Sequence, residues 1–150
     1  MRGYPALFSN FITLIVALLF LSGCLLIPTM LDMRLEWELD LWRPSNNWRW
    51  SIAIIHTLTA IVMALILGAL WSIHIRVGLR QKKHHRSGLL MLALFTALML
   101  TSVIIFYSGN EQISVYASLI HTLIGGALLM LFYYHRSTGI RMRHTHHHAK

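Results

Sequence analysis

The sequence predicts an all-α integral membrane protein, built as a four-helix bundle, and three observations lead to this fold class. Of the 150 residues, 56% are hydrophobic and 12% are charged, about half the charged share of a typical soluble domain. Four uncharged stretches are long enough to cross a bilayer, which takes about 20 apolar residues in a helix. The charged residues lie between these stretches and at the chain ends. This composition excludes an ordinary soluble enzyme, a disordered tail and a nucleic-acid-binding module.

The four stretches are residues 6–27, 50–75, 87–107 and 113–134. We expect each to be a helix, because lipid offers no hydrogen-bond partner to an exposed backbone. No stretch shows the alternating pattern of a strand in a membrane β-barrel. We expect the whole chain to form a single membrane domain, in which residues 135–150 are a flexible, histidine-rich tail.

The distribution of charge predicts the orientation of these spans, because lysine and arginine are enriched in cytoplasmic loops. Most basic residues lie before the first span, between the second and third, or after the fourth: Arg2, Arg76, Arg80, Lys82, Lys83, Arg86, Arg136, Arg141, Arg143 and Lys150. All five acidic residues lie in the other two loops: Asp32, Glu36, Glu38, Asp40 and Glu111. Both termini are therefore predicted to be cytoplasmic. The net charge of +8 then reflects topology rather than nucleic-acid binding.

The first span has an alternative interpretation. Leu21-Ser22-Gly23-Cys24 looks like a bacterial lipoprotein signal, which would be cleaved so that the cysteine becomes lipidated. The apolar run continues to Ile27, however, and is longer than a typical signal core. We therefore favour a retained helix in which Cys24 is an inert packing residue. As the single cysteine of the chain, it excludes an internal disulfide and a cysteine-built metal cluster.

The loop that follows this span shows a period of two. Its apolar residues alternate with charged ones: Leu31, Met33, Leu35, Trp37, Leu39 and Leu41. This pattern predicts an extended strand with one apolar face. We expect the strand to lie on the membrane interface, anchored by Trp37 and Trp42; the alternative is an edge for a periplasmic partner.

Histidines within the spans are the candidate functional residues, because histidine in a bilayer is rare and costly. His56 lies six residues after Trp50, and His121 lies eight residues after Ile113. Both helices are expected to start on the outer side, so the two histidines are predicted at similar depth. His74 and His135 lie at the inner ends of the same two helices.

The angular positions agree with these depths. His56 and His74 are five full turns apart at 100° per residue, and His121 and His135 are about 40° short of four turns. Four-helix bundles build cofactor sites from side chains on facing helices. Two histidines on opposite sides of a porphyrin iron form a six-coordinate b-type haem. The spacing predicts an outer haem on His56 and His121.

An inner haem is predicted on His74 and His135. At a rise of 1.5 Å per residue, His56 and His74 are about 27 Å apart along their helix, whereas His121 and His135 are about 21 Å apart along theirs. His84 or His85, at the start of the third span, is therefore an alternative inner ligand.

Other residues are candidates to contact a haem. Gly125 and Gly126 follow His121 by about one turn and leave room for a porphyrin, although close helix packing explains them equally well. Arg49, Arg76 and Arg136 are candidates to pair with propionates, because arginine binds carboxylates bidentately; lipid head groups are the alternative partners. The tail histidines could bind a transition metal, but a solvated chain end is favoured: His144, His146, His147 and His148.

Residues 47–136 contain the positions His56, His74-Ile75-Arg76, His85-Arg86-Ser87-Gly88, His121 with Gly125, and His135-Arg136. In these positions the chain resembles the four-helix, bis-histidine membrane cytochromes b. That family includes bacterial cytochrome b561 and the cytochrome b subunits of formate dehydrogenase and hydrogenase.

The resemblance implies two non-covalent b haems, or one if the inner site is absent, in the cytoplasmic (inner) membrane of a bacterium. It implies electron transfer between a membrane quinone pool and a periplasmic or membrane redox partner protein. We therefore expect an electron-transfer subunit without catalytic residues of its own rather than a stand-alone enzyme.

Two other classes compete with this interpretation. A small membrane transporter or accessory subunit could use histidines to relay protons or bind metal ions. A purely structural subunit could pack against larger membrane partners. Acidic residues inside the spans would favour a transporter, and the four spans contain none.

Overall fold

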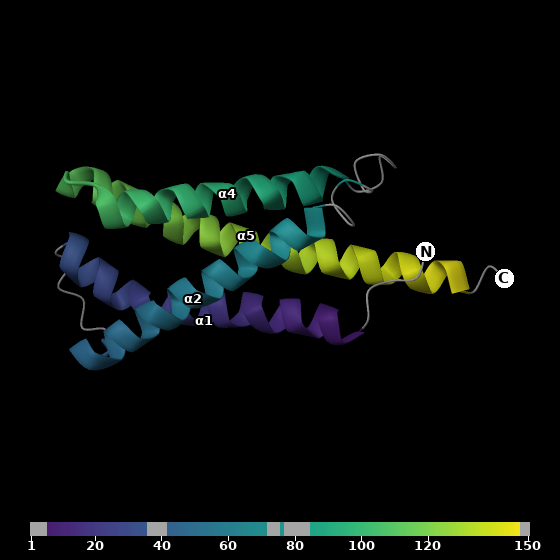
Figure 1. The fold of residues 1–150 in the computed structure, drawn as a ribbon, viewed down its shortest axis with the longest axis horizontal. Helices are drawn as coiled ribbons and strands as arrows, with labels where there is room; N and C mark the ends of the chain where they lie inside the picture. The colour runs from purple at the N-terminus through teal and green to yellow at the C-terminus, as the bar shows by residue number, and fades with distance from the viewer. Residues whose placement is uncertain (1–5, 36–41, 72–75, 77–84, 148–150) are drawn as a thin grey trace. The chain divides into compact units, whose positions relative to one another are not determined.

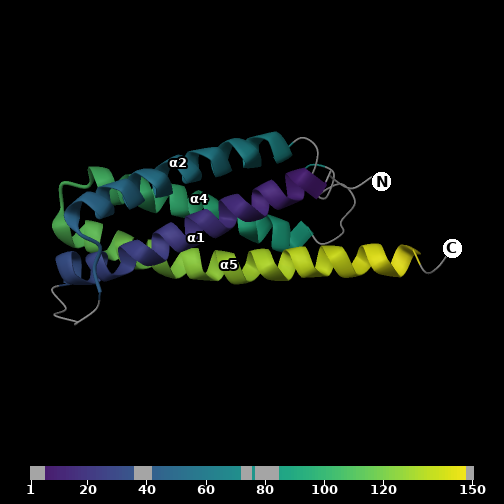
Figure 2. The ribbon, with the colours of Figure 1, turned by 90° about the horizontal axis from the view of Figure 1, so that it is seen from below.

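The computed structural model describes residues 6–35, 42–71, 76 and 85–147. Within this part of the chain the protein is all-helical, as Figures 1 and 2 show. The helices are α1 (Ala6–Leu35), α2 (Asn46–Leu70), α4 (His85–Tyr107) and α5 (Glu111–His147).

All four helices are long and apolar enough to cross a membrane. The candidate spans are Leu7–Met33, Asn46–Leu70, Arg86–Tyr107 and Glu111–Thr138. The prediction of four apolar helices is therefore confirmed. The end of the second predicted span, residues 72–75, lies outside the described residues.

Contacts divide the chain into two compact units, Met1–His74 and Ile75–Lys150. In the first unit α1 packs against α2, and in the second unit α4 packs against α5. Within each pair the two helices run antiparallel (Figures 1 and 2). The single four-helix domain expected from the sequence stays a prediction.

Polar and apolar residues are distributed as in a protein surrounded by lipid. Five of the buried residues are hydroxyl-bearing: Ser22, Thr59, Thr101, Ser114 and Ser118. Large apolar side chains face outward, with Leu65 70%, Leu123 73% and Met130 72% exposed. In water such surfaces would form unusually large apolar patches, whereas in lipid they cost nothing and buried hydroxyls need partners inside the protein. Among the described residues, small hydroxyl-bearing side chains are therefore buried beside apolar ones such as Met63 and Phe95, and such polar residues are common where helices pack in membranes.

Four of these five hydroxyls, those of Ser22, Thr59, Thr101 and Ser118, donate to carbonyls of their own helices. Thr59 donates to the carbonyl of Ile55 at 2.6 Å, and Ser118 donates to that of Ser114 at 2.8 Å. Each bond joins a side chain to the carbonyl four residues earlier, which is how serine and threonine satisfy themselves in a helix. Such residues can therefore lie at a helix interface without an unpaired donor.

The predicted strand after the first span is wrong for residues 31–35, because α1 continues through Pro28 to Leu35. A short alternating pattern is ambiguous, and leucine, methionine and arginine favour helix. Extending an existing helix also needs no new nucleus. Residues 36–41, including Trp37, lie outside the described part of the chain. Trp42 is 71% exposed.

The last helix is longer than the predicted span. Its helical backbone continues beyond Tyr134 to His147, where a flexible tail was expected from residue 135. The segment contains no proline, and one glycine inside a helix is tolerated. At 1.5 Å per residue, the part after Tyr134 adds about 20 Å to α5.

A short turn joins α4 to α5. The Ile113 N–H donates to Asn110 Oδ1 at 3.1 Å, and the Asn110 N–H donates to Ser108 Oγ at 3.2 Å. Asn110 is thus the N-cap of α5, where a side-chain oxygen satisfies a backbone donor that the helix leaves unpaired. The Ser114 hydroxyl donates to the Ile105 carbonyl of α4 at 3.2 Å. These bonds fix where the antiparallel pair begins.

Replacing the cap residue should weaken the α4–α5 pair. We expect Asn110→Ala to lower the free energy of unfolding by about 0.5–2 kcal/mol, the usual cost of losing an N-cap. Asn110→Ser keeps a capping oxygen and should retain most of the stability. The measurement is reversible unfolding in mixed detergent micelles, followed by circular dichroism. Gln112→Ala, at an exposed position of the same turn, is the control; an equal loss in both alanine variants would contradict the cap assignment.

Candidate functional site

His56, on α2, lies against α1. Its Nδ1 is 2.9 Å from Ser22 Oγ. The Ser22 hydroxyl is buried and lies 2.6 Å from the Leu18 carbonyl, to which it donates. A Cβ added to Gly23 would lie 3.4 Å from His56 Cε1. The imidazole therefore sits against the backbone of α1 at the Ser22-Gly23 dipeptide.

His121, on α5, makes the same kind of contact with α4. Its Nδ1 is 2.9 Å from Thr101 Oγ1. The buried Thr101 hydroxyl donates to the Ala97 carbonyl at 2.9 Å. We call such a pair, a histidine Nδ1 and a hydroxyl from the neighbouring helix, a hydroxyl–imidazole contact.

His135 makes a third hydroxyl–imidazole contact, with Ser87 of α4. The Nδ1 to Oγ distance is again 2.9 Å. A Cβ on Gly88 would lie 4.0 Å from His135 Cε1. The same serine–glycine dipeptide thus faces a histidine in both units: Ser22-Gly23 opposite His56, and Ser87-Gly88 opposite His135.

The two hydroxyl–imidazole contacts of the second unit have the same spacing along α4 and along α5. Ser87 and Thr101 are fourteen residues apart on α4, and their partners His135 and His121 are fourteen residues apart on α5. Fourteen residues are two heptads, which return to the same face when two packed helices follow a 3.5-residue repeat. Both rings therefore lie on the face that α5 turns to α4, at two levels about 21 Å apart along the helix.

The structure does not describe every predicted ligand. His74 and His84 lie outside the described residues, as does the side chain of His85, the first residue of α4. His56 and His121 belong to different units, so their pairing stays a prediction. No group of three or more histidine, cysteine, aspartate or glutamate residues comes together among the side chains that are described.

The glycines after His121 face open space. A Cβ at Gly125 or Gly126 would meet no atom within 4 Å apart from its local backbone. Within the described α4–α5 pair, these two glycines therefore make no close contact with the neighbouring helix. The space beside Gly125 is what a bulky planar ligand near His121 requires. The residues present are compatible with a porphyrin at this level of α5.

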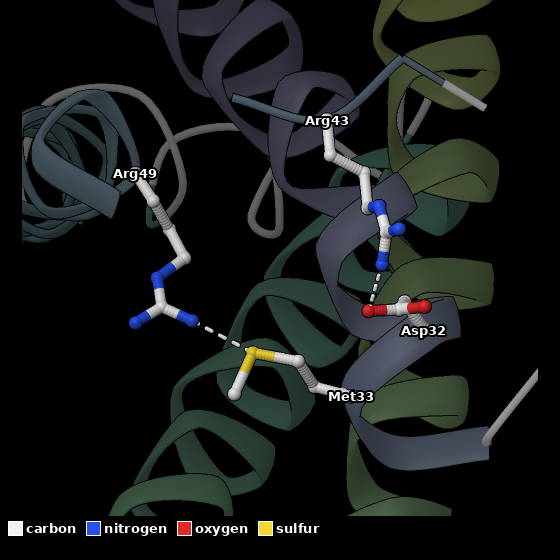
Figure 3. A network of polar contacts seen from close by, with 4 residues as sticks. All are labelled: Asp32, Met33, Arg43 and Arg49. Carbon is white, nitrogen blue, oxygen red and sulfur yellow. Dashed lines mark hydrogen bonds and ion pairs between the residues drawn. The ribbon is translucent and has the colours of Figure 1, made fainter. Parts of the chain in front are cut away.

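A polar network closes one end of the α1–α2 pair, as Figure 3 shows. Arg43 forms an ion pair with Asp32. Arg49 donates to the sulfur of Met33 at 2.7 Å and to Asn46 Oδ1 at 2.8 Å. Since guanidinium has five N–H groups, these neutral acceptors leave Arg49 with further donors.

The other predicted propionate partners lie in the second unit. Arg76 is exposed, and Arg136 is partly buried next to His135 on α5. Their pairing with propionates stays a prediction.

Cys24 is exposed, so the interpretation of this residue as a packing residue is corrected. It follows Ser22 by two residues, about 200° around the helix, while Ser22 faces α2. The side chain therefore points away from the helix that α1 packs against.

Sequence reasoning identified the histidines but missed their hydroxyl partners. From the sequence, Ser22 belongs to a possible lipoprotein signal, and Ser87 begins a span and lies in a stretch that carries the family resemblance; neither pattern indicates a histidine partner. Two signals could have found them: the repeated serine–glycine dipeptide, and the fourteen residues from Ser87 to Thr101 that match the spacing from His121 to His135.

Comparison with known proteins adds no relative: no protein-family model, no curated protein and no solved structure matches this chain.

The close approach at Gly23 gives a direct test of the α1–α2 packing. We expect Gly23→Leu to destabilise the protein by about 1–3 kcal/mol, the usual cost of overpacking, because the side chain would collide with the His56 ring. Gly23→Ala should be tolerated, since its Cβ reaches ordinary van der Waals distance. Gly68→Leu, where nothing lies within 4 Å, is the control. Detergent unfolding midpoints measure the difference, and similar values for the two leucine variants would refute the packing.

Proposed function

We propose that this chain is a multi-pass membrane cytochrome b, which binds haem through histidines of its spans and transfers electrons within the bilayer. The observation that supports it most is the pair of hydroxyl–imidazole contacts at His56 and His121. Each of these residues lies in an apolar helix, and each has Nδ1 engaged by a buried hydroxyl of the neighbouring helix.

This arrangement is typical of ligating histidines. A histidine that binds a metal almost always donates its other ring N–H to a protein partner, which orients the ring. A histidine that served helix packing alone would gain only about 0.6 kcal/mol from such a bond in a membrane, while its burial there is costly. The same contact at three of the four histidines predicted as haem ligands therefore favours a cofactor role.

The residues that would bind the group follow from these positions. His56 and His121 would ligate the outer haem. His135 would ligate the inner one, with His74, His84 or His85 as its second ligand. The open space at Gly125 would accept the porphyrin, and Arg49, Arg76 and Arg136 would pair with propionates or lipid head groups. A bound haem supplies one-electron chemistry, and the chain's apolar helices exclude water from it.

The wider setting of the proposal comes from topology and family resemblance. The basic residues before the first span, between the second and third and after the fourth support a cytoplasmic position for both termini, and the resemblance to bacterial cytochromes b supports a bacterial inner membrane. A quinone pool and a periplasmic or membrane redox protein are the proposed partners. In this role the chain is an electron-transfer subunit of an oxidoreductase.

A proton- or metal-conducting membrane protein is the second candidate. It is favoured by one observation: α5 presents His121 and His135 at two levels, each bonded to a hydroxyl. Histidines linked to hydroxyls across a membrane could relay protons. A protein that binds haem is coloured and one without haem is colourless, so the colour of the purified protein distinguishes the two candidate functions.

Haem content tests the proposal directly. We expect purified protein to show a low-spin b-type spectrum with close to two non-covalent haems per chain. His56→Ala or His121→Ala should abolish the outer haem signal, because an iron that loses one axial ligand is bound less firmly and changes spin state. His135→Ala should affect the inner haem alone, and His146→Ala is the matched control. A colourless protein from haem-replete cells would refute the proposal, whereas one haem per chain would remove only the inner site.

The open space at Gly125 provides a second test. We expect Gly125→Leu to lower haem affinity about tenfold or more, since overpacking costs about 1–3 kcal/mol and 1.4 kcal/mol is a factor of ten. The unfolding midpoint of the apoprotein should stay unchanged, because nothing lies within 4 Å of the added Cβ. Ala127→Leu, at an exposed position of the same helix, is the control. Haem titration of the apoprotein in detergent measures the change, and normal affinity in Gly125→Leu would place the porphyrin elsewhere.

A further inference from the structure

We propose that Ser22 and Thr101 are positioning residues that fix the ring tautomer of His56 and His121, so that Nδ1 carries the proton and Nε2 carries the lone pair. The haem as the recipient of that lone pair rests on the proposed function. The tautomer itself does not, and it can be measured without any cofactor.

A hydroxyl group has a single hydrogen to donate. Ser22 donates its hydrogen to the Leu18 carbonyl at 2.6 Å, and Thr101 donates its hydrogen to the Ala97 carbonyl at 2.9 Å. A hydroxyl that has already donated can only accept in a further hydrogen bond. The ring nitrogen 2.9 Å away must then be the donor in both contacts.

The tautomer follows from the number of protons on the ring. A neutral imidazole has one N–H and one nitrogen with a lone pair. With Nδ1 as the donor to the hydroxyl, the lone pair lies on Nε2. This is the form of histidine that binds a metal through Nε2, with the partner of the other nitrogen determining the tautomer.

The orientation of the ring is fixed together with its protonation. Turning the His56 ring over would put a carbon in place of Nδ1 and leave the Ser22 oxygen without its donor. The Cε1 edge already lies against the backbone at Gly23, where even a methyl group would approach to 3.4 Å. Ser22 and Gly23 thus restrict the ring at two points before any ligand binds.

The assignment covers two of the three hydroxyl–imidazole contacts. Ser87 lies 2.9 Å from His135 Nδ1 in the same way. The residue four positions before Ser87 is Lys83, which lies outside the described residues. The tautomer is therefore assigned for His56 and His121 alone.

The nature of the acceptor has a consequence for a bound metal. A carboxylate on Nδ1–H would draw the proton away and make the ring a stronger ligand. Ser22 and Thr101 are neutral acceptors in the apolar interior, so the imidazoles remain neutral ligands. Replacing Ser22 or Thr101 with a residue that lacks a hydroxyl removes this neutral acceptor from the Nδ1–H group. The ligand then becomes less basic and the reduced iron is favoured, which raises the reduction potential.

The test measures the tautomer in the full chain before haem loading. Apoprotein labelled with ¹³C and ¹⁵N histidine is placed in phospholipid bilayers and measured by solid-state NMR, which distinguishes a proton on Nδ1 from one on Nε2. We expect the Nδ1–H form at His56 and His121. Thr101→Val should abolish this signal for His121 and leave that of His56. Because the Leu19 carbonyl also hydrogen-bonds His56, Ser22→Ala should weaken the His56 signal and leave that of His121. Thr101→Ser keeps the hydroxyl and should retain the signal.

The matched control is Thr96→Val, on the same helix. Thr96 also donates to the carbonyl four residues earlier, at 2.9 Å, but it is exposed. A proton on Nε2 of His121 in the wild-type apoprotein would overturn the inference, as would identical spectra for Thr101→Val and Thr96→Val. Because the wild-type measurement decides by itself, the test does not depend on the folding of any variant.

A second readout uses the haem-loaded protein. Thr101→Val should raise the midpoint potential of the outer haem while its spectrum stays low-spin, and Thr96→Val should leave the potential unchanged. A protein that binds no haem but shows the Nδ1–H form would refute the proposed function and leave the tautomer assignment standing. A protein that binds haem but has Nε2–H rings before loading would do the reverse.

Discussion

The hydroxyl–imidazole contact is the interaction on which the described structure depends. In an apolar surrounding a polar ring must find its partner inside the protein, and a histidine in the middle of a helix can find it only on a neighbouring helix. Ser22 and Thr101 provide these partners while satisfying their own hydrogens along α1 and α4. The contacts therefore join α2 to α1 and α5 to α4 at the levels of His56 and His121.

The four apolar helices could be predicted from the sequence because hydropathy is a local property. The helix ends could not, because the pattern near Leu35 and Tyr134 is short and propensity decides there. The histidines could be identified as candidate site residues because histidine is rare in spans. Serine and threonine are common there, and Ser22 and Thr101 stand out only through their histidine partners, 34 and 20 residues away. Such pairings depend on interhelical register, which composition does not reveal.

The register of α4 and α5 also resolves an apparent mismatch on α5. With 3.6 residues per turn, His121 and His135 differ by about 40°. Helices that pack with a 3.5-residue repeat remove this difference, and the two contacts with Thr101 and Ser87 lie on one face as a result. The fourteen-residue spacing is therefore a property of the α4–α5 pair as a whole, and the serine and threonine on α4 repeat it.

That shared spacing limits how a second ligand could complete the inner site. The two levels on α5 are fixed about 21 Å apart by contacts within one helix pair, so they cannot shift independently. For the proposed inner haem, the eighteen residues from His56 to His74 would cover about 27 Å in a straight helix, which exceeds this value. In the proposed outer site, His56 and His121 each contact one hydroxyl of the helix they pack against. A protein that binds a single haem would therefore be expected to retain the outer site, where both rings are oriented before the ligand arrives and less entropy is lost on binding.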